Sequence, residues 1–211
     1  MADETTPPTP PEAAAAPPAA EAKKEPPKKV EATDASAHPW VASIRAAVPE
    51  SVLSAKEFVR QVTVTVAREK IRDVARHLKE REDFRYCVDI TGVDWKQRKP
   101  RFDVVYHFYS FSKNDRIRIK CGVEDGEEVP SIATLFLAAN WPERETWDMF
   151  GIPFAGHPGL QRILTWEGFH GHPLRKDFPL EGIDTGAAVY PEEWPAGGGP
   201  SATDPNRKVV S

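Results

Sequence analysis

Cysteine is scarce in this sequence. Its two cysteines, Cys87 and Cys121, lie in separate apolar runs, and neither belongs to a CxxC pair. Iron–sulfur clusters usually require four cysteine ligands, and structural zinc sites require Cys or His residues paired at short spacing. The chain alone therefore lacks the ligands for a standard cluster. We expect both thiols to be buried and reduced, as in a reducing compartment.

Long apolar runs are also missing. A helix needs about 20 apolar residues to cross a bilayer, and no stretch of the sequence approaches that length. Asp3 and Glu4 lie where a secretory signal would be basic, and no arginine precedes Arg45. Neither a signal peptide nor a mitochondrial transit peptide is predicted. We expect the protein to be made and kept in the cytoplasm.

Positive charge is not in excess. The formal net charge is -4 at pH 7 and the isoelectric point is about 5.9. Binding to phosphate backbones requires a basic field that this composition does not provide, so we expect no nucleic-acid partner. The glycine-rich phosphate loops GxGxxG and GxxxxGK and the GxSxG elbow of hydrolases are absent too.

Composition divides the chain into three predicted parts. Residues 1–38 are rich in Pro, Ala, Glu and Lys, which predicts a disordered extension that serves as a tether or recruits a partner or anionic lipid through its lysines. Residues 39–152 are predicted to form one globular domain. Residues 153–211 lose regular periodicity and are predicted to form an extended C-terminal docking segment with a flexible end.

Hydrophobic periodicity predicts an α+β fold in which helices cover one side of an antiparallel sheet. The predicted helices are residues 40–48, 68–82, 131–139 with Ser131 as N-cap, and 142–150 with Gly151 as the C-terminal stop. The predicted strands are residues 62–66, 85–95, 102–111 and 116–123. Short polar turns join the last three strands, which are therefore expected to pair as an antiparallel meander. Charged and apolar residues alternate in the last strand, so one sheet face should meet water or a partner.

The densest block of aromatic, charged and glycine residues begins at Glu143. Glu143 and Trp147 are four residues apart on the predicted helix, as are Arg144 and Asp148, which predicts an Arg–Asp pair beside an aromatic anchor. An ordinary amphipathic helix with a surface salt bridge would explain the same pattern.

A proline-bounded segment, residues 171–179, follows this block. Its prolines reduce the entropy lost on docking, Arg175 offers a bidentate fork, and Phe169 and Phe178 offer apolar anchors. We expect a strap that docks on a partner. The alternative is a loop that closes over its own core.

Three histidines, His157, His170 and His172, together with Asp177 present the ligand types of a zinc or iron site. They lie on Gly- and Pro-rich loops, however, and neither HxxxH nor HExxH is present. We therefore expect structural histidines and no metal ligands in this chain.

These motifs resemble a known family. The ERExWDMFG helix at residues 143–151, FxGHPxLxRIL at residues 154–164 and GHPLRKDFP at residues 171–179 are similar to the signature of the C subunit of bacterial NADH:quinone oxidoreductase, the thirty-kilodalton subunit family of respiratory complex I. The resemblance extends over residues 40–182. Residues before and after that range have no dependable counterpart.

The resemblance implies a non-catalytic, cofactor-free subunit of the peripheral arm, on the cytoplasmic side of the cell inner membrane. It would lie against the quinone-site subunit, which carries the letter D in bacteria, and near the cluster-bearing B and I subunits. NADH, FMN, iron–sulfur clusters and quinone would belong to the assembly. Two alternatives remain: an equivalent scaffold subunit of a related membrane-bound hydrogenase or other dehydrogenase complex, and an independent histidine-based metalloenzyme.

The predicted partner-docking residues come from the helix, the following turn and the strap. They are Glu143, Arg144, Glu145, Trp147, Asp148, His157, Arg162, His172, Arg175, Lys176, Asp177 and Phe178.

Overall fold

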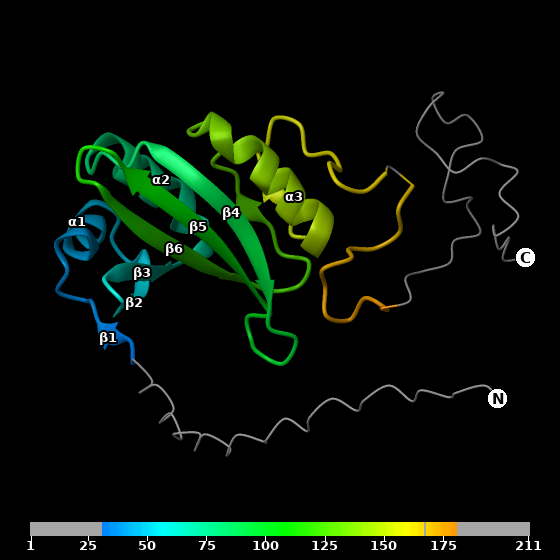
Figure 1. The fold of residues 1–211 in the computed structure, drawn as a ribbon, viewed down its shortest axis with the longest axis horizontal. Coiled ribbons are helices and arrows are strands. Elements are labelled where there is room, and N and C mark those ends of the chain that lie inside the picture. Colours follow the sequence, from blue (N-terminus) through cyan, green and yellow to red (C-terminus); the bar gives the residue numbers. More distant parts are fainter. Residues whose placement is uncertain (1–30, 167, 181–211) are drawn as a thin grey trace, which may run out of the picture. The chain divides into compact units, whose positions relative to one another are not determined.

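The computed structural model describes residues 31–166 and 168–180. The expected N-terminal extension lies almost entirely outside these residues, as does the end of the C-terminal segment. A six-stranded sheet with the order β1-β2-β3-β6-β5-β4 forms the body of the domain (Figure 1). The strands are β1 (Thr33–Asp34), β2 (Val52–Phe58), β3 (Gln61–Val66), β4 (Tyr86–Asp94), β5 (Phe102–Ser110) and β6 (Asp115–Val123).

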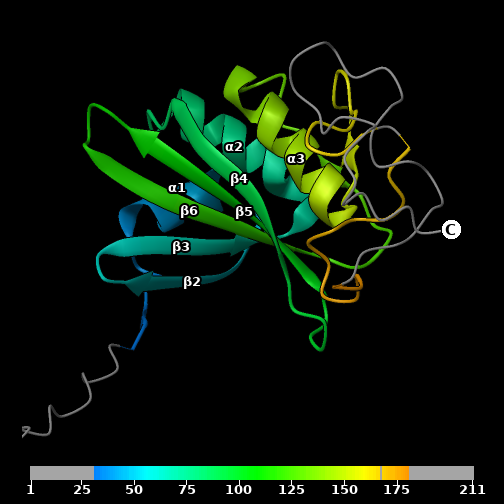
Figure 2. The same cartoon turned by 45° about the vertical axis from the view of Figure 1, so that its right-hand side comes forward.

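The antiparallel meander predicted from the sequence is confirmed, because β5 pairs antiparallel with both β4 and β6. The sheet as a whole is mixed, however, since β3 runs parallel to β6, so the expectation of a purely antiparallel sheet needs correction. Figure 2 shows β3 and β6 side by side in the same sheet. A long connection through a helix and two strands separates β3 from β6, and such a crossover permits parallel pairing.

Three helices cover one side of this sheet: α1 (Pro39–Ala47), α2 (Ile71–Glu80) and α3 (Asn140–Phe150). A short 3-10 turn, Arg68–Lys70, precedes α2. Apolar faces of these helices bury residues such as Ile44, Leu78 and Met149 against the inward side chains of the sheet. The predicted α+β class and the helices near residues 40, 70 and 142 are confirmed.

The helix predicted for residues 131–139 is wrong. Val129–Pro130 instead forms strand β7, which pairs parallel with β8 (Phe154–Ala155), and the helical conformation there is limited to the 3-10 turn Leu137–Ala139. The hydroxyl of Ser131 donates a hydrogen bond to Glu143 and accepts one from the amide of Ala133. Ser131 thus bonds to α3 and does not cap a helix of its own. A tertiary contact overrides the local capping signal here.

Gly151 ends α3 in the left-handed conformation, with a φ of 76°. A Cβ atom added there would meet the ring of His172 at 2.6 Å. We therefore expect Gly151→Ala to lower the free energy of unfolding by about 2–3 kcal/mol, since it adds both backbone strain and a clash. Urea unfolding measures this loss. Gly159→Ala is the control, because no atom lies within 4 Å of its added Cβ and its φ is not positive; equal losses in the two variants would contradict the prediction.

Candidate partner-docking site

Glu143 is completely buried at the start of α3. Its carboxylate accepts hydrogen bonds from the Ser131 hydroxyl at 2.6 Å and the Ile132 amide at 2.7 Å, and the ring of the equally buried His157 lies 3.9 Å away. Burial raises the pKa of the Glu143 carboxyl to about 7, because the two hydrogen bonds only partly offset the loss of hydration. Glu143, one of the predicted docking residues, is therefore buried inside the domain.

Asp148 lies one turn further along α3 and is also completely buried. One of its carboxylate oxygens accepts hydrogen bonds from three successive backbone amides, those of Ile163, Leu164 and Thr165, at 3.1, 2.9 and 2.9 Å. The other oxygen accepts from the Thr165 hydroxyl and, at 2.6 Å, from Nη1 of Arg162. Burial opposes ionisation, but these bonds outweigh it and hold the pKa of Asp148 well below its usual value.

The expected pair between Arg144 and Asp148 is therefore wrong. Asp148 pairs with Arg162 and not with Arg144, since the loop after β8 folds back over α3. Arg144 reaches the same loop and donates to the carbonyl oxygens of Gln161 and Arg162, each at 3.0 Å. Both arginines thus fasten the loop to the helix. Four-residue spacing on the helix could not reveal a loop that returns from further along the chain.

The other helix positions differ in exposure. Trp147 is half-buried, with the guanidinium of Arg162 5.7 Å above its ring, whereas Glu145 is exposed. Of the predicted helix residues, Glu145 is thus the one whose charge faces solvent. Glu143 and Asp148 act inside the domain and hold the surface in shape.

The strap residues contact their own domain. The His172 ring bonds to the Asp148 carbonyl at 2.9 Å, the Leu174 amide to the Met149 carbonyl at 3.1 Å, and the Lys176 amide to the Asp94 carboxylate at 2.8 Å. These contacts agree with the alternative of a loop that closes over its own core. Docking of the same segment on a partner remains a prediction.

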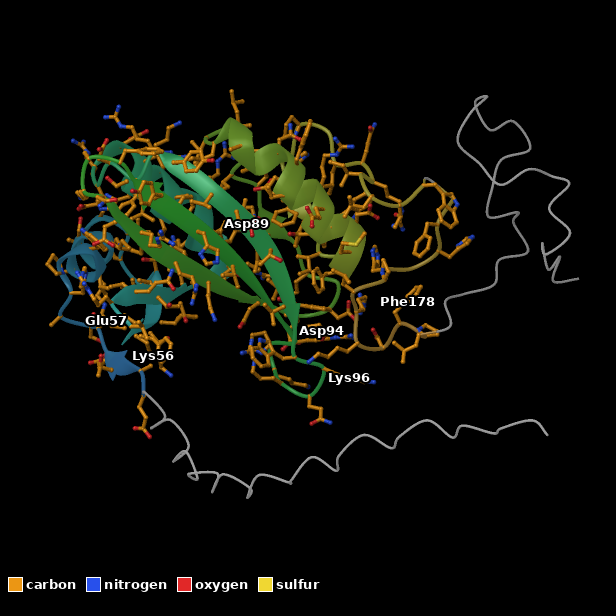
Figure 3. The ribbon with its side chains drawn as sticks, viewed as in Figure 1. Lys56, Glu57, Asp89, Asp94, Lys96 and Phe178 are labelled. Atoms are coloured by element: carbon orange, nitrogen blue, oxygen red, sulfur yellow. The ribbon has the colours of Figure 1, made fainter. Side chains whose placement is uncertain are left out.

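A charged network at the end of the sheet secures the strap, and Figure 3 shows Asp94 there. Arg101 bonds to Asp94 and Asp177, both at 2.8 Å, while Arg175 bonds to Asp125 and lies 3.4 Å from Asp177. The hydrogen bond from Arg101 is the main cause that lowers the pKa of Asp177, to about 2. Sequence reasoning missed Asp94, Arg101 and Asp125, because residues so far apart in the chain leave no periodic signal.

The remaining strap residues lie at the surface. Phe178 stacks on Phe169 with ring centroids 5.9 Å apart, so the two predicted apolar anchors lie together. The Lys176 side chain is exposed. A hollow of about 280 Å³ is lined here by Gly171, His172, Arg175, Asp177, Phe178 and Pro179.

The histidines have separate surroundings. His157 bonds to the Asn140 carbonyl at 3.1 Å and accepts from the Gly159 amide at 3.0 Å, whereas His170 is exposed. Within residues 31–166 and 168–180, no three His, Cys, Asp or Glu side chains are grouped so as to hold a metal ion. The metalloenzyme alternative therefore gains no support from the described residues.

Large apolar side chains are exposed around α3. We call this set the α3 rim: Leu137, Trp141, Leu164, Trp166 and Leu174, with exposed fractions of 88%, 69%, 63%, 52% and 55%. Leu137 and Trp141 are four residues apart at the helix start, and the bonds to Asp148 and Met149 hold Leu164 and Leu174 beside the helix. Figure 2 shows the loop and strap beside α3. Exposed apolar patches of this kind mark protein interaction sites.

The thiols are poorly suited to catalysis. Cys87 and Cys121 are buried and unpaired, and burial is the main cause that raises the pKa of each to about 12. A thiol with so high a pKa supplies almost no thiolate nucleophile at neutral pH. In the parts of the chain that the structure describes, each helix is too short or too polar to cross a membrane.

Comparisons with known proteins agree on one family. Residues 64–184 match the family described as respiratory-chain NADH dehydrogenase, 30 Kd subunit. The C subunit of NADH-quinone oxidoreductase from Rhodobacter capsulatus is 51% identical over 136 residues, which are 64% of this chain and 68% of the relative. The same subunit of Geobacter sulfurreducens is 47% identical over 136 residues, 64% of this chain and 84% of the relative.

A solved structure shares the fold. It is a chain of the membrane-bound sulfane sulfur reductase, an archaeal respiratory membrane complex, with a TM-score of 0.57 and 27% identity over 66% of this chain and 84% of that chain. The motifs around α3, the matching domain and the identity to bacterial relatives lead to the same assignment. The chain belongs to the family of the 30 kDa subunit of respiratory-chain NADH dehydrogenase.

Proposed function

We propose that this chain is a non-catalytic, cofactor-free subunit that supports electron transfer by docking on the quinone-site subunit of NADH:quinone oxidoreductase. In the assembly, electrons pass from NADH through FMN and iron–sulfur clusters to quinone. The cluster-bearing B and I subunits would be further neighbours. The chain would lie on the cytoplasmic side of the inner membrane and contact the membrane only through the complex.

The α3 rim is the observation that carries this proposal. Leu137, Trp141 and Leu164 are 88%, 69% and 63% exposed, and burial of such side chains against a partner is favourable. Beneath them, the buried carboxylates Glu143 and Asp148 fix the positions of the loops. A rigid, apolar surface of this kind can bind a partner without a large entropic cost, because little of it must become ordered.

A different observation favours a second candidate. The structural neighbour belongs to a membrane-bound sulfane sulfur reductase, so a scaffold of this shape occurs in more than one type of respiratory complex. The chain could support a related complex, such as a membrane-bound hydrogenase, with another electron donor. Its structural role would be the same in both.

Affinity purification of the tagged full chain in mild detergent tests the proposal. We expect a multi-subunit assembly that contains the quinone-site subunit and reduces quinone with NADH. An assembly that oxidises hydrogen instead would support the second candidate. A lone protein without partners would contradict both.

Substitutions in the α3 rim test the docking surface. We expect Trp141→Ala and Leu164→Ala each to reduce the amount of the quinone-site subunit that copurifies by about tenfold, because exposed apolar anchors dominate binding energy. The control is Leu53→Ala, which removes a side chain of similar exposure, 67% against 63% for Leu164, from another part of the surface. Equal recovery with all three variants would exclude the α3 rim as the docking site.

Truncation after Gly168 separates the two interpretations of the strap. If residues 171–179 dock on a partner, the shortened chain should be lost from the assembly. If assembly survives, the strap closes over its own domain only. Circular dichroism of the shortened chain shows whether the domain still folds, since Asp94 and Arg101 lose their strap contacts.

A further inference from the structure

The sheet face opposite the helices carries basic side chains that none of the contacts around α3 uses. Arg116, Arg118 and Lys120 alternate along β6 with completely buried residues, so all three lie on this face. The strand register places Lys56 of β2 in one row with Arg118, with Thr63 of β3 between them. We call Lys56, Arg116, Arg118 and Lys120 the basic face.

These four cations have no ionic partner within the described chain. No carboxylate of residues 31–166 or 168–180 lies within 4.0 Å of their nitrogen atoms. Arg118 donates a hydrogen bond to the amide oxygen of Gln61 at 2.7 Å, a neutral partner. The Lys56 row ends in a carboxylate on each side, because Asp34 of β1 pairs with Lys56 and Asp89 of β4 pairs with His107; Figure 3 shows Lys56 and Asp89 on their separate strands. The cations therefore outnumber the free carboxylates here.

The positive potential of this face reaches His107, which pairs with Arg118 across β5 and β6. Burial is the main cause that lowers the pKa of His107, and the charges of Arg118, Lys120 and Arg116 lower it further, while Asp89 opposes them. The chain as a whole carries a net charge of -4. Positive charge has therefore been concentrated on one face of an acidic protein.

Aromatic side chains extend the basic face at one end. Tyr109 pairs with Arg116 on one side and with Tyr86 on the other, so the three lie in one row. The rings of Tyr86 and Tyr109 lie 5.6 and 4.9 Å from that of Phe111, which is 73% exposed. Arginine and aromatic residues are enriched at protein interfaces.

We propose that the basic face docks against an acidic surface of another subunit of the same assembly, as a second interface separate from the α3 rim. The proposal rests on the proposed role as a subunit of a respiratory complex. Complementary charge would fix the orientation of the partner, and the exposed rings of Tyr86 and Phe111 would supply contact area. An anionic lipid surface is the competing occupant, and the experiment separates the two.

Lysine footprinting of the purified native complex tests this proposal without a substitution. The amines of Lys56 and Lys120 are acetylated in the complex and in the isolated full chain, with Lys96 and Lys99, exposed on the loop between β4 and β5, as internal controls. We expect Lys56 and Lys120 to react at least about tenfold more slowly in the complex, because an interface excludes the reagent. Lys96 and Lys99 should be unchanged. Equal reactivity of all four lysines in the two samples would overturn the proposal.

Charge reversal provides the second test. We expect the double variant Arg118→Glu/Lys120→Glu to reduce recovery of the chain in the complex by at least about tenfold, since like charges then face each other. The control variant Lys96→Glu/Lys99→Glu changes the net charge equally and should assemble normally. Arg118→Thr/Lys120→Thr keeps a strand-compatible side chain and should show a smaller loss in the same direction. Normal assembly of both variants at positions 118 and 120 would contradict the proposal.

Three outcomes separate the competing explanations. If vesicles containing phosphatidylglycerol protect Lys56 and Lys120 of the isolated chain, and lipid removal exposes them in the complex, the occupant is lipid and the proposal is overturned. If the chain never copurifies with a respiratory complex, the proposed function fails and this interface fails with it. A chain that assembles through the α3 rim but leaves Lys56 and Lys120 reactive overturns the second interface alone.

Discussion

Asp148→Asn should lower the free energy of unfolding by about 3–4 kcal/mol, because it replaces a buried, fully hydrogen-bonded carboxylate by an amide. An amide cannot accept hydrogen bonds from three backbone N–H groups on one side and from Arg162 and Thr165 on the other. Arg162 and the Thr165 hydroxyl would lose this buried acceptor if the amide oxygen stayed with the three backbone amides. Urea unfolding of the full-length variant measures the loss.

The same variant should loosen the loop over α3. Amide hydrogen exchange of Ile163, Leu164 and Thr165 should become at least about tenfold faster than in the unmodified chain, because each of these amides bonds to Asp148. Glu145→Gln is the matched control, since it neutralises an exposed carboxylate on the same helix. Similar exchange rates in both variants would show that Asp148 does not hold the loop.

At acidic pH, the difference in stability between the unmodified chain and Asp148→Asn should become smaller. The pKa of Asp148 in the folded protein is lower than its ordinary value of 3.8, so its contribution to stability is fully present above pH 3.8 and is lost as the pH falls toward the folded pKa. The gap between the unmodified chain and Asp148→Asn should therefore narrow below about pH 4.

Glu143→Gln should change how stability depends on pH. The folded pKa of Glu143, about 7, lies above its ordinary value of 4.5. The folded state therefore binds more protons than the unfolded state between these values, and its stability falls as the pH rises from about 4.5 to about 7. Glutamine is neutral throughout and lacks this slope. Relative to the unmodified chain, the variant should gain about 3 kcal/mol between pH 5 and pH 8.

Urea unfolding at four pH values between 5 and 8 measures this gain. The two chains differ at this one carboxyl group, so the difference between their curves reports the ionisation of Glu143. Glu145→Gln should instead give a curve parallel to that of the unmodified chain, because Glu145 is exposed. Parallel curves for Glu143→Gln as well would show that Glu143 is ionised in the folded protein at pH 5.

Removal of the Glu143 side chain should be harmful at every pH. Glu143→Ala leaves the buried Ile132 amide without an acceptor and opens a cavity beside His157. We expect a loss of about 2–4 kcal/mol. The comparison with glutamine thus separates the role of the hydrogen bond from the effect of the charge.

Sequence reasoning identified the elements whose periodicity is strong. The amphipathic helix α2, the meander of β4, β5 and β6, and the end of α3 at Gly151 were predicted correctly, because each depends on local spacing or on local backbone conformation. Strand β2 was missed, since its exposed and buried residues do not alternate cleanly. The helix after Ser131 was predicted wrongly, because its cap-like residue bonds to Glu143 instead.

The candidate site, like the fold, was predicted only in part from the sequence. The motifs between residues 143 and 179 led to the family, and the structure places most of their polar residues in contact with one another. Their partners were not predictable, however. Arg162, and not Arg144, pairs with Asp148, and Arg101 joins Asp94 to Asp177. Such pairs depend on how the loops fold back over the domain, and the path of a loop cannot be predicted from the spacing of residues in the sequence.

The sequence by itself determined the family, the scarcity of metal-ligating cysteines and the order of the main elements, because these follow from residue identity and local periodicity. The tertiary structure decided which charged residues are exposed. It buries Glu143 and Asp148, which look like surface helix acids, and it aligns Lys56, Arg116, Arg118 and Lys120 from two strands on one face. Burial and strand register are properties of the folded chain, and they set the hydration and the neighbours on which each charge depends.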